Sequence, residues 1–243
     1  MAQAGPNPAP QAPRRHVIRR FWPVLVLVAG LALFLALRLD RYVGFEALKE
    51  HRTLLMDLVD RHAVAMMAGF IALYALAAAF SLPVAAVLSI SGGFLFGQTW
   101  GTVLNVLAAS IGATILFLAA RTAIGDSLRQ RAGPWLRRME DGFKQNAFSY
   151  LLFLRLVPLF PFVAVNLVPA ALGVSLRDFA LATVIGIIPG AFVYAAVGVG
   201  LGSVFDAGEA FTAKGILTPQ VVTALVGLAC LALVPVVYKK LRR

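Results

Sequence analysis

The sequence predicts an all-α polytopic membrane protein, and three observations lead to this fold class. The chain has 243 residues, of which 60% are hydrophobic, and its mean hydropathy is +0.84. Only 14% of the residues are charged, and they are concentrated between long apolar runs. A helix needs about 20 apolar residues to cross the ~30 Å hydrocarbon core of a bilayer. Several runs in this chain approach or exceed that length, which an ordinary soluble domain does not show.

The N-terminal part predicts a membrane anchor behind a basic tail. Residues 1–20 begin with a segment rich in proline, alanine and glutamine, which is typical of disorder, and end in four arginines. The apolar run at residues 21–39 resembles a signal peptide. It is longer than the usual apolar region of such a peptide and lacks a good cleavage site. We therefore expect an uncleaved transmembrane helix at 21–39.

Two of the later apolar regions are interrupted near their middle. Residues 63–97 are broken at Pro83, and residues 147–173 are broken at Pro158 and Pro161. In the second region, the parts before and after Pro158 are each too short to cross the bilayer. Each proline also removes a backbone donor, which lipid permits only where protein or water satisfies the freed groups. We expect both regions to be re-entrant hairpins that enter and leave on one side.

The charges between the apolar regions predict the orientation, because lysine and arginine are retained on the cytoplasmic side. With the N-tail inside and both hairpins re-entrant, residues 40–62 lie outside with four basic and five acidic residues. Residues 121–146 then lie inside with six basic and three acidic residues, and the basic C-terminus also lies inside. If residues 63–80 crossed instead, both basic segments would lie outside. The sequence therefore predicts four transmembrane helices, two hairpins and cytoplasmic termini.

This topology is an inverted repeat, the architecture of many secondary transporters. Each hairpin is followed by one spanning helix, and the two hairpins enter from opposite sides. The connecting segments have amphipathic spacing and are expected to lie flat at the membrane surface, with soluble helices that cap the bundle as the alternative. The predicted core is 63–202, made of a hairpin at 63–97, a helix at 100–121, an amphipathic loop at 122–146, a hairpin at 147–173 and a helix at 177–202; an interfacial segment at 40–62 precedes it, and a last transmembrane helix at 219–238 follows.

Arg155 lies alone in the second broken region. A guanidinium stays protonated, and a charge at membrane depth is costly. As a functional group, Arg155 would receive a phosphate or carboxylate in a polar cavity. As a structural group, it would pair with hairpin carbonyls or extend to the cytoplasmic edge. Asn166 has the same two interpretations, because its amide could satisfy carbonyls freed by the prolines or contact a ligand.

Arg121 and a group of glycines are further candidates. From its position at the end of an apolar run, Arg121 is typical of a positively charged anchor at a helix end. Gly92, Gly93 and Gly97 lie in the run SGGFLFG, where glycine allows a tight turn or a close approach of backbones. This run is not a phosphate-binding loop, since the lysine and the strand-to-helix context are missing.

Several residue patterns are absent, which argues against other functions. Residues 63–120 contain no ionisable Asp, Glu, Lys, Arg or His, although a proton-coupled transporter usually keeps an acid in its pathway. The three histidines lie outside the predicted spans without metal-ligand spacing, and no catalytic triad or carboxylate pair is visible. We expect no metal, no cofactor and no enzymatic activity. The net charge of +11 lies in tails and loops, so it indicates membrane orientation rather than nucleic-acid binding.

The arrangement R-x-x-P-x-x-P-x-x-x-x-N-x-x-x-x-x-x-G resembles the second-hairpin signature of the DedA superfamily, and in particular its VTT-domain branch, also called SNARE-associated Golgi proteins. GGFLFG and the pattern F-x-x-x-R are similar to the same branch. The residues that carry the resemblance are Arg155, Pro158, Pro161, Asn166 and Gly173, then Gly92–Gly97, then Phe117 and Arg121.

This resemblance implies two opposed re-entrant hairpins and a function in lipid translocation. Bacterial relatives are linked to recycling of the phosphorylated polyprenyl carrier, and eukaryotic relatives to phospholipid scrambling. Arg121 and Arg155 match arginines that the family needs for function. Proton-coupled members carry acids in the first hairpin, where this chain has Ala78 and the Ser89–Ser91 region. The departure argues against proton coupling at that place and favours facilitated lipid movement or coupling through other groups.

The sequence thus predicts an integral membrane lipid transporter, similar to a flippase or scramblase, that moves a polyprenyl phosphate or a phospholipid. The expected partners are anionic or phosphorylated membrane lipids, without nucleic acid, and a homo-oligomer is left open. The composition favours a bacterial inner membrane. The alternatives are a small-anion transporter or channel, and a non-transporting scaffold for membrane-protein assembly. Predicted substrate-binding residues are Arg155, Arg121 and Asn166, and predicted hairpin-shaping residues are Pro83, Gly92, Gly93, Gly97, Pro158, Pro161 and Gly173.

Overall fold

The computed structural model describes residues 14–38, 44–131, 146–156 and 160–206. Within these ranges the chain is almost entirely helical, with short turns and no strand. Some predictions therefore lie outside the described residues: the disordered start of the N-tail at 1–13, most of the amphipathic loop at 122–146, Pro158, and the last transmembrane helix at 219–238.

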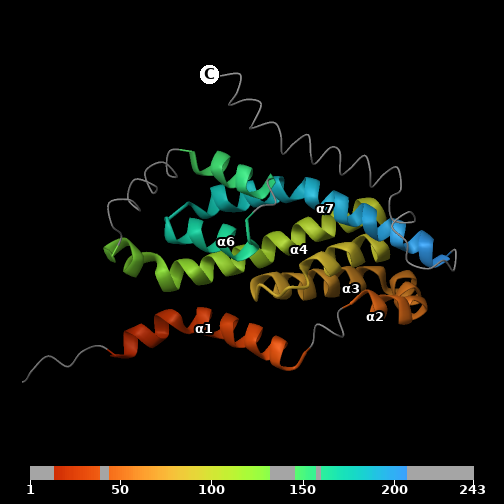
Figure 1. Cartoon of the computed structure of the whole chain (residues 1–243), viewed down its shortest axis with the longest axis horizontal. Helices are drawn as coiled ribbons and strands as arrows, with labels where there is room; N and C mark the ends of the chain where they lie inside the picture. Colours follow the sequence, from red (N-terminus) through yellow and green to blue (C-terminus); the bar gives the residue numbers. More distant parts are fainter. Residues whose placement is uncertain (1–13, 39–43, 132–145, 157–159, 207–243) are drawn as a thin grey trace, which may run out of the picture.

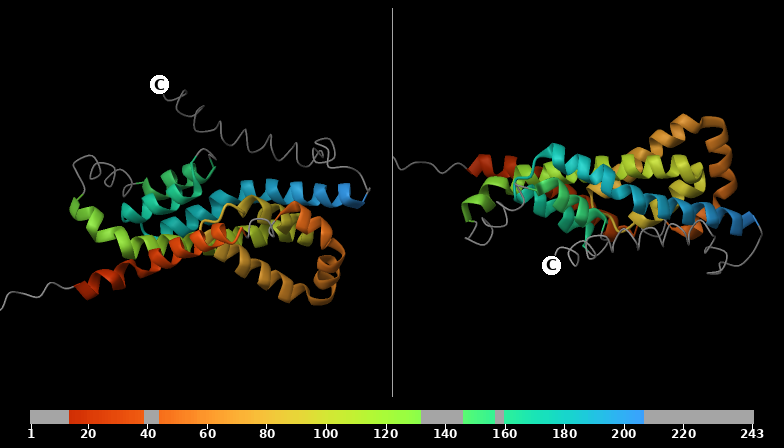
Figure 2. Two further views of the ribbon diagram at one scale, coloured as in Figure 1. Left: turned by 60° about the horizontal axis from the view of Figure 1, so that its bottom comes forward. Right: turned by 90° about the horizontal axis from the view of Figure 1, so that it is seen from above.

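The described helices form an elongated bundle around one long central helix, α4 (Figure 1). α3 and α7 pack along α4, and α6 packs against it as well (Figures 1 and 2). α1 lies along one edge of the bundle, where the Phe34 side chain is buried in the core. The bounds are α1 Arg14–Ala36, α2 Phe45–Glu50, α3 Arg52–Ala79, α4 Ala85–Arg131, α6 Phe162–Ala171 and α7 Leu176–Asp206, and residues 146–156 are also helical.

α3 and the first part of α4 form a helical hairpin. The chain reverses at residues 80–84, where Ser81 has a positive φ of 56°. Two local departures divide the long helices: His62 bends α3 (φ −135°, ψ 44°), and Gly97 bends α4 (φ 74°, ψ −178°). The backbone of Gly97 is in a region that is essentially restricted to glycine. The hairpin therefore ends at a position where the residue type itself permits the change of direction.

The second broken region also contains a proline and a glycine at its turns. Pro161 precedes the first turn of α6, where a missing N–H costs no helical hydrogen bond. α6 ends at Ala171 with Leu172 as its C-cap, and Gly173 follows with a positive φ of 72°. α7 then begins behind Ser175, whose hydroxyl accepts a hydrogen bond from the Asp178 backbone N–H at 3.0 Å. This bond satisfies one of the free donors at the helix start.

The outer surface of the bundle is apolar along whole helix faces. On α4, Val103, Leu107, Ile111, Ile115 and Leu118 follow each other at helical spacing and are exposed. An exposed stripe of this kind suits lipid and is rare on a protein surface in water. Three described helices are long and apolar enough to cross a bilayer: Arg52–Ala79, Ala85–Ala123 and Leu176–Gly202.

The contact between the first part of α4 and α7 depends on glycine. A Cβ on Gly93 would collide with the backbone of Ala195, and a Cβ on Gly198 would collide with the backbone of Ile90 and Phe94. Such close approach is how helices pack in lipid, where apolar side chains gain little from burial. It brings the first hairpin against α7 and fixes one wall of the site described next.

Candidate functional site

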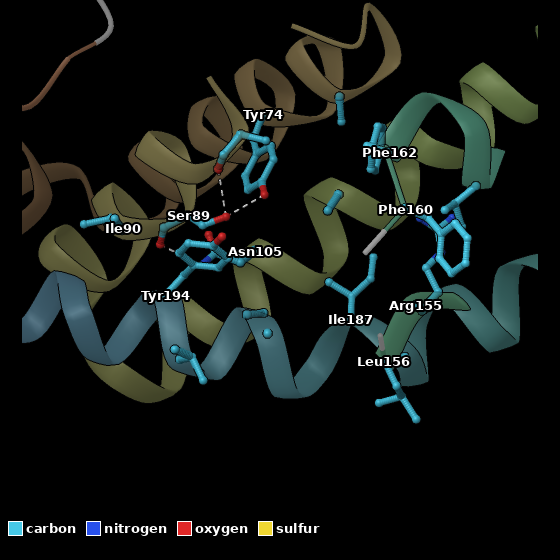
Figure 3. A pocket seen from close by; sticks show the side chains of 18 of the residues that line it. Tyr74, Ser89, Ile90, Asn105, Arg155, Leu156, Phe160, Phe162, Ile187 and Tyr194 are labelled. Atoms are coloured by element: carbon cyan, nitrogen blue, oxygen red, sulfur yellow. Dashed lines mark hydrogen bonds between the residues drawn. The ribbon is translucent and has the colours of Figure 1, made fainter. Parts of the chain in front are cut away.

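A cavity of about 570 Å³ lies between the two broken regions. Its walls come from α3, both parts of α4, the helix at 146–156, α6 and α7. Most of the lining is apolar, and polar side chains gather at two places, one around Arg155 and one around Tyr74 (Figure 3). The volume is in the range of small-molecule binding sites.

Arg155 is held by side chains from two other elements. Its Nη2 donates to Asn166 Oδ1 of α6 at 2.6 Å and to Thr183 Oγ1 of α7 at 3.0 Å. Asn166 is fully buried and donates from Nδ2 to the Phe162 carbonyl at 2.7 Å, one turn earlier in α6. Asn166 therefore satisfies a helix carbonyl and at the same time orients the arginine.

Two aromatic rings and a glycine complete the surroundings of the guanidinium. The Arg155 Cζ lies 5.4 Å from the ring centroid of Phe179 and 5.8 Å from that of Phe162, within cation–π range. Phe179 in turn stacks on Phe117 of α4, with centroids 4.1 Å apart. On the other side, a Cβ at Gly186 would collide with the Arg155 side chain. The arginine can lie against α7 only because residue 186 is glycine.

The charge of Arg155 has no counter-ion among the described residues. No acidic side chain lines the cavity in this part of the chain, and the Asn166 and Thr183 oxygens are neutral acceptors. Arg155 Nε is buried and has no hydrogen-bond partner within the described residues. A buried donor without a partner costs about 1–3 kcal/mol, and more on a charged group. Arg155 thus lacks both a counter-ion and an acceptor for Nε among the described residues, and a bound anion would supply both.

The second polar cluster is uncharged and comes from the first half of the chain. Tyr74 Oη of α3 lies 2.6 Å from Ser89 Oγ, and Ser89 Oγ donates to the Ala85 carbonyl at 2.9 Å. Asn105 Nδ2 donates to the Ser89 carbonyl at 2.8 Å. All three polar residues are buried and line the cavity (Figure 3).

The predicted site residues occupy different places. Arg155 lines the cavity, and Asn166 accepts a hydrogen bond from Arg155. Arg121 is instead exposed on α4 and is not part of the described lining. Phe117, one turn before Arg121, is buried and supports Phe179 beneath Arg155. Pro83 is exposed in the turn of the first hairpin, and Gly92 makes room for the Asn105 side chain.

Four polar residues of the two clusters were not predicted as site residues: Tyr74, Ser89, Asn105 and Thr183. Each is a polar residue in an apolar run without charged residues. That signal was present, but serine and threonine are common in membrane helices, where they bond their own backbone. Nothing in the spacing alone distinguishes these four from such residues.

Long apolar helices with exposed apolar faces, and a cavity between them that contains two polar clusters, define this chain as a helical integral membrane protein. Residues 82–200 match the family model of the VTT domain. The chain is 30% identical over 201 residues to the Transmembrane protein 41 homolog of Dictyostelium discoideum. The aligned region covers 81% of this chain and 58% of that relative. The chain is 27% identical over 185 residues to Transmembrane protein 41B of Homo sapiens, where the aligned region covers 74% and 61%, respectively.

Residues 82–200 are thus a VTT domain, which confirms the resemblance to the DedA/VTT family carried by the motifs. The chain spans about three fifths of the length of these two curated relatives. No solved structure matches it.

Proposed function

We propose that this protein moves phosphate-bearing lipids across the membrane and that Arg155 binds the lipid phosphate. The observation that carries the proposal is the guanidinium of Arg155, which has no counter-ion among the described residues and lies at the wall of a mainly apolar cavity. A phosphate would supply the missing acceptor, and charge-assisted bonds from arginine to phosphate are among the strongest hydrogen bonds in proteins. The apolar lining and the apolar outer helix faces suit acyl chains better than a hydrated inorganic anion.

The topology that we propose for this function has four spanning helices and two opposed re-entrant hairpins. The positive φ at Gly97 and Gly173 supports it, because each glycine turns the chain between a returning limb and a longer helix. The charge bias of the loops supports an orientation with both termini in the cytoplasm of a bacterial inner membrane. In this arrangement the broken elements meet near the middle of the bilayer, where transporters bind their substrates.

Arg121 has a separate place in the proposal. It is exposed on α4, so we assign it a contact with lipid phosphates outside the described cavity. Arg121 lies close to the end of the apolar span Ala85–Ala123, and an arginine near the membrane surface is well placed for such a contact. Its function is tested separately from that of Arg155 by measuring the flux of an Arg121→Gln variant.

The deciding experiment is a flux assay with the full chain in lipid vesicles. Arg155→Ala is expected to abolish movement of polyprenyl phosphate and phospholipids while expression and unfolding temperature stay near normal. Arg155→Lys should keep part of the activity, because lysine retains the charge but cannot form the bidentate hydrogen bonds of a guanidinium to phosphate. Arg177→Ala is the matched control, since it removes an exposed arginine outside the cavity.

The same assay separates the alternatives. Unchanged lipid flux in Arg155→Ala would remove the residue from the mechanism. A small-anion transporter would instead show wild-type flux of inorganic anions that polyprenyl phosphate does not inhibit. A scaffold would show no flux of either kind, and its Arg155 variant would change cross-linked partners only.

A further inference from the structure

The two polar clusters of the cavity are built from equivalent parts of the two halves of the chain. The first limb is α3 in the first half and the helix at 146–156 in the second half, and the returning limb is the first part of α4 or α6, respectively. In each half, a side chain of the first limb contacts a polar side chain of the returning limb. In each half, a glycine of positive φ follows the returning limb, and the next helix adds a third polar side chain. The equivalent pairs are Tyr74 and Arg155, Ser89 and Asn166, Gly97 and Gly173, and Asn105 and Thr183.

The uncharged cluster has hydrogen-bond acceptors in excess. Ser89 Oγ donates its only proton to the Ala85 carbonyl, so the Tyr74 hydroxyl donates to Ser89 and keeps free lone pairs. Asn105 uses its amide nitrogen on the Ser89 carbonyl, which fixes the orientation of the amide. Asn105 Oδ1 then accepts no hydrogen bond within the described residues, although the side chain is only 1% exposed.

Buried amide oxygens in proteins nearly always accept a hydrogen bond. Asn105 lines the same cavity as Arg155, and no described charged group lies at its end of the cavity. Among the described residues, one end of the cavity thus has an unpaired buried donor, Arg155 Nε, and the other end has an unpaired buried acceptor, Asn105 Oδ1. A ligand that satisfies both ends carries an anionic group at one position and hydrogen-bond donors at another.

We propose that Tyr74, Ser89 and Asn105 form a second subsite, which binds hydroxyl or primary ammonium donors of a lipid head group whose phosphate is bound by Arg155. This inference rests on the proposed function and deepens it by naming the substrate class. Phosphatidylglycerol and phosphatidylethanolamine carry such donors, whereas the trimethylated head group of phosphatidylcholine has none. The first two lipids use both ends of the cavity, and the third uses only the Arg155 end.

The test measures binding of short-chain lipids to the purified full chain in detergent by titration calorimetry. Phosphatidylglycerol, phosphatidylethanolamine and phosphatidylcholine with identical acyl chains are compared. At least one donor-bearing lipid is expected to bind about threefold to tenfold more tightly than phosphatidylcholine, the effect of about one net hydrogen bond. The lipid that is preferred identifies the donor as hydroxyl or ammonium.

Variants assign the preference to the cluster. Tyr74→Phe removes one hydroxyl and keeps the ring, and Asn105→Leu removes the unpaired oxygen at similar volume. In both variants, the ratio of the affinity for the preferred lipid to that for phosphatidylcholine is expected to fall toward one. The affinity for phosphatidylcholine itself should stay the same. Tyr150→Phe is the matched control, because Tyr150 is exposed and outside the described cavity lining. If Asn105→Leu does not fold, the nearly isosteric Tyr74→Phe decides alone.

Failure of this inference and failure of the proposed function give different results. Equal binding of all three lipids by the wild-type protein overturns the second subsite, whether or not flux is seen. A preference that survives in Tyr74→Phe and in folded Asn105→Leu also overturns it. A donor preference that depends on the cluster, in a protein without lipid flux, supports the subsite and overturns transport.

Discussion

At the scale of the residue, the decisive feature is how Arg155 is held. Neutral oxygens of Asn166 and Thr183 orient Nη2, two phenylalanine rings flank the guanidinium, and Nε is left without a partner among the described residues. A buried charge is normally paired, and pairing it internally would make it useless for binding an anion. Here the surroundings orient the cation without neutralising it.

This balance predicts the effect of Asn166→Asp. The carboxylate would lie where Asn166 Oδ1 now accepts from Arg155 at 2.6 Å, and it would neutralise the guanidinium. The variant loses the bond to the Phe162 carbonyl, worth about 1 kcal/mol, but gains an ion pair. We expect a folded protein with an unfolding temperature close to that of the wild type and lipid flux reduced at least about tenfold, equivalent to about 1.4 kcal/mol.

Thr183→Ser is the control for that variant, because it keeps a hydroxyl acceptor for Arg155 Nη2. Its flux should stay near the wild-type level. If Asn166→Asp moved lipid as fast as the wild type, phosphate binding at Arg155 would be excluded.

At the scale of the element, glycines determine where helices bend and how closely they approach. A Cβ added to Gly97 would meet no atom within 4 Å, so the requirement for glycine there is conformational. Gly186 is instead restricted by the Arg155 side chain, which a Cβ would meet. These two causes predict different consequences of adding a methyl group.

Gly97→Ala is expected to destabilise the protein by about 1–3 kcal/mol, because alanine is strained at φ 74°, ψ −178°. Gly69→Ala is the matched control: Gly69 is helical and has open space around it. It should be neutral or up to about 1 kcal/mol more stable, through helix propensity. The measurement is the unfolding temperature of both variants in the same detergent. Equal effects would show that the bend at Gly97 does not depend on glycine.

Gly186→Ala is expected to push the helix at 146–156 away from α7, because the new Cβ would collide with Arg155. Overpacking of this kind costs about 1–3 kcal/mol, and lipid flux should fall together with stability. Gly190 lies one turn later in α7 and also lines the cavity, but it has open space. Gly190→Ala should therefore retain both stability and flux. A loss of flux in both variants would indicate that small residues are needed along the whole cavity wall.

At the scale of the whole molecule, the question is how the bundle sits in the bilayer. α3 runs from Arg52 to Ala79 and is long and apolar enough to cross, although it bends at His62. Length alone therefore permits a spanning helix where we propose one limb of a re-entrant hairpin. The charges favour the topology that we propose, because only the re-entrant one places residues 121–146 in the cytoplasm.

Single cysteines test this topology after Cys230→Ser removes the native thiol. Thr53→Cys and Asn146→Cys place thiols at exposed positions on either side of the proposed core. A membrane-impermeant reagent should label Thr53→Cys from outside intact cells and Asn146→Cys only after the membrane is opened. Labelling of both from the same side would exclude the two-hairpin topology.

The sequence determined the class of protein and singled out Arg155, because apolar length, proline, glycine and charge act locally along the chain. The cost of a charge in lipid and the backbone freedom of Gly97 are properties of single residues and need no knowledge of neighbours. The position of Arg121 alone predicted a positively charged anchor, and only the family resemblance made it a candidate binding residue beside Arg155.

Only the tertiary structure decided which helix faces meet. It placed Thr183 and Phe179 around Arg155 from 28 and 24 positions further along the chain, and it left Arg121 exposed. It also brought Asn105 to the cavity with an oxygen that has no partner among the described residues. The physical reason is that membrane helices of similar composition pack through close contacts at small residues such as Gly93, Gly186 and Gly198. Those contacts depend on the arrangement of the whole bundle, which no single segment specifies.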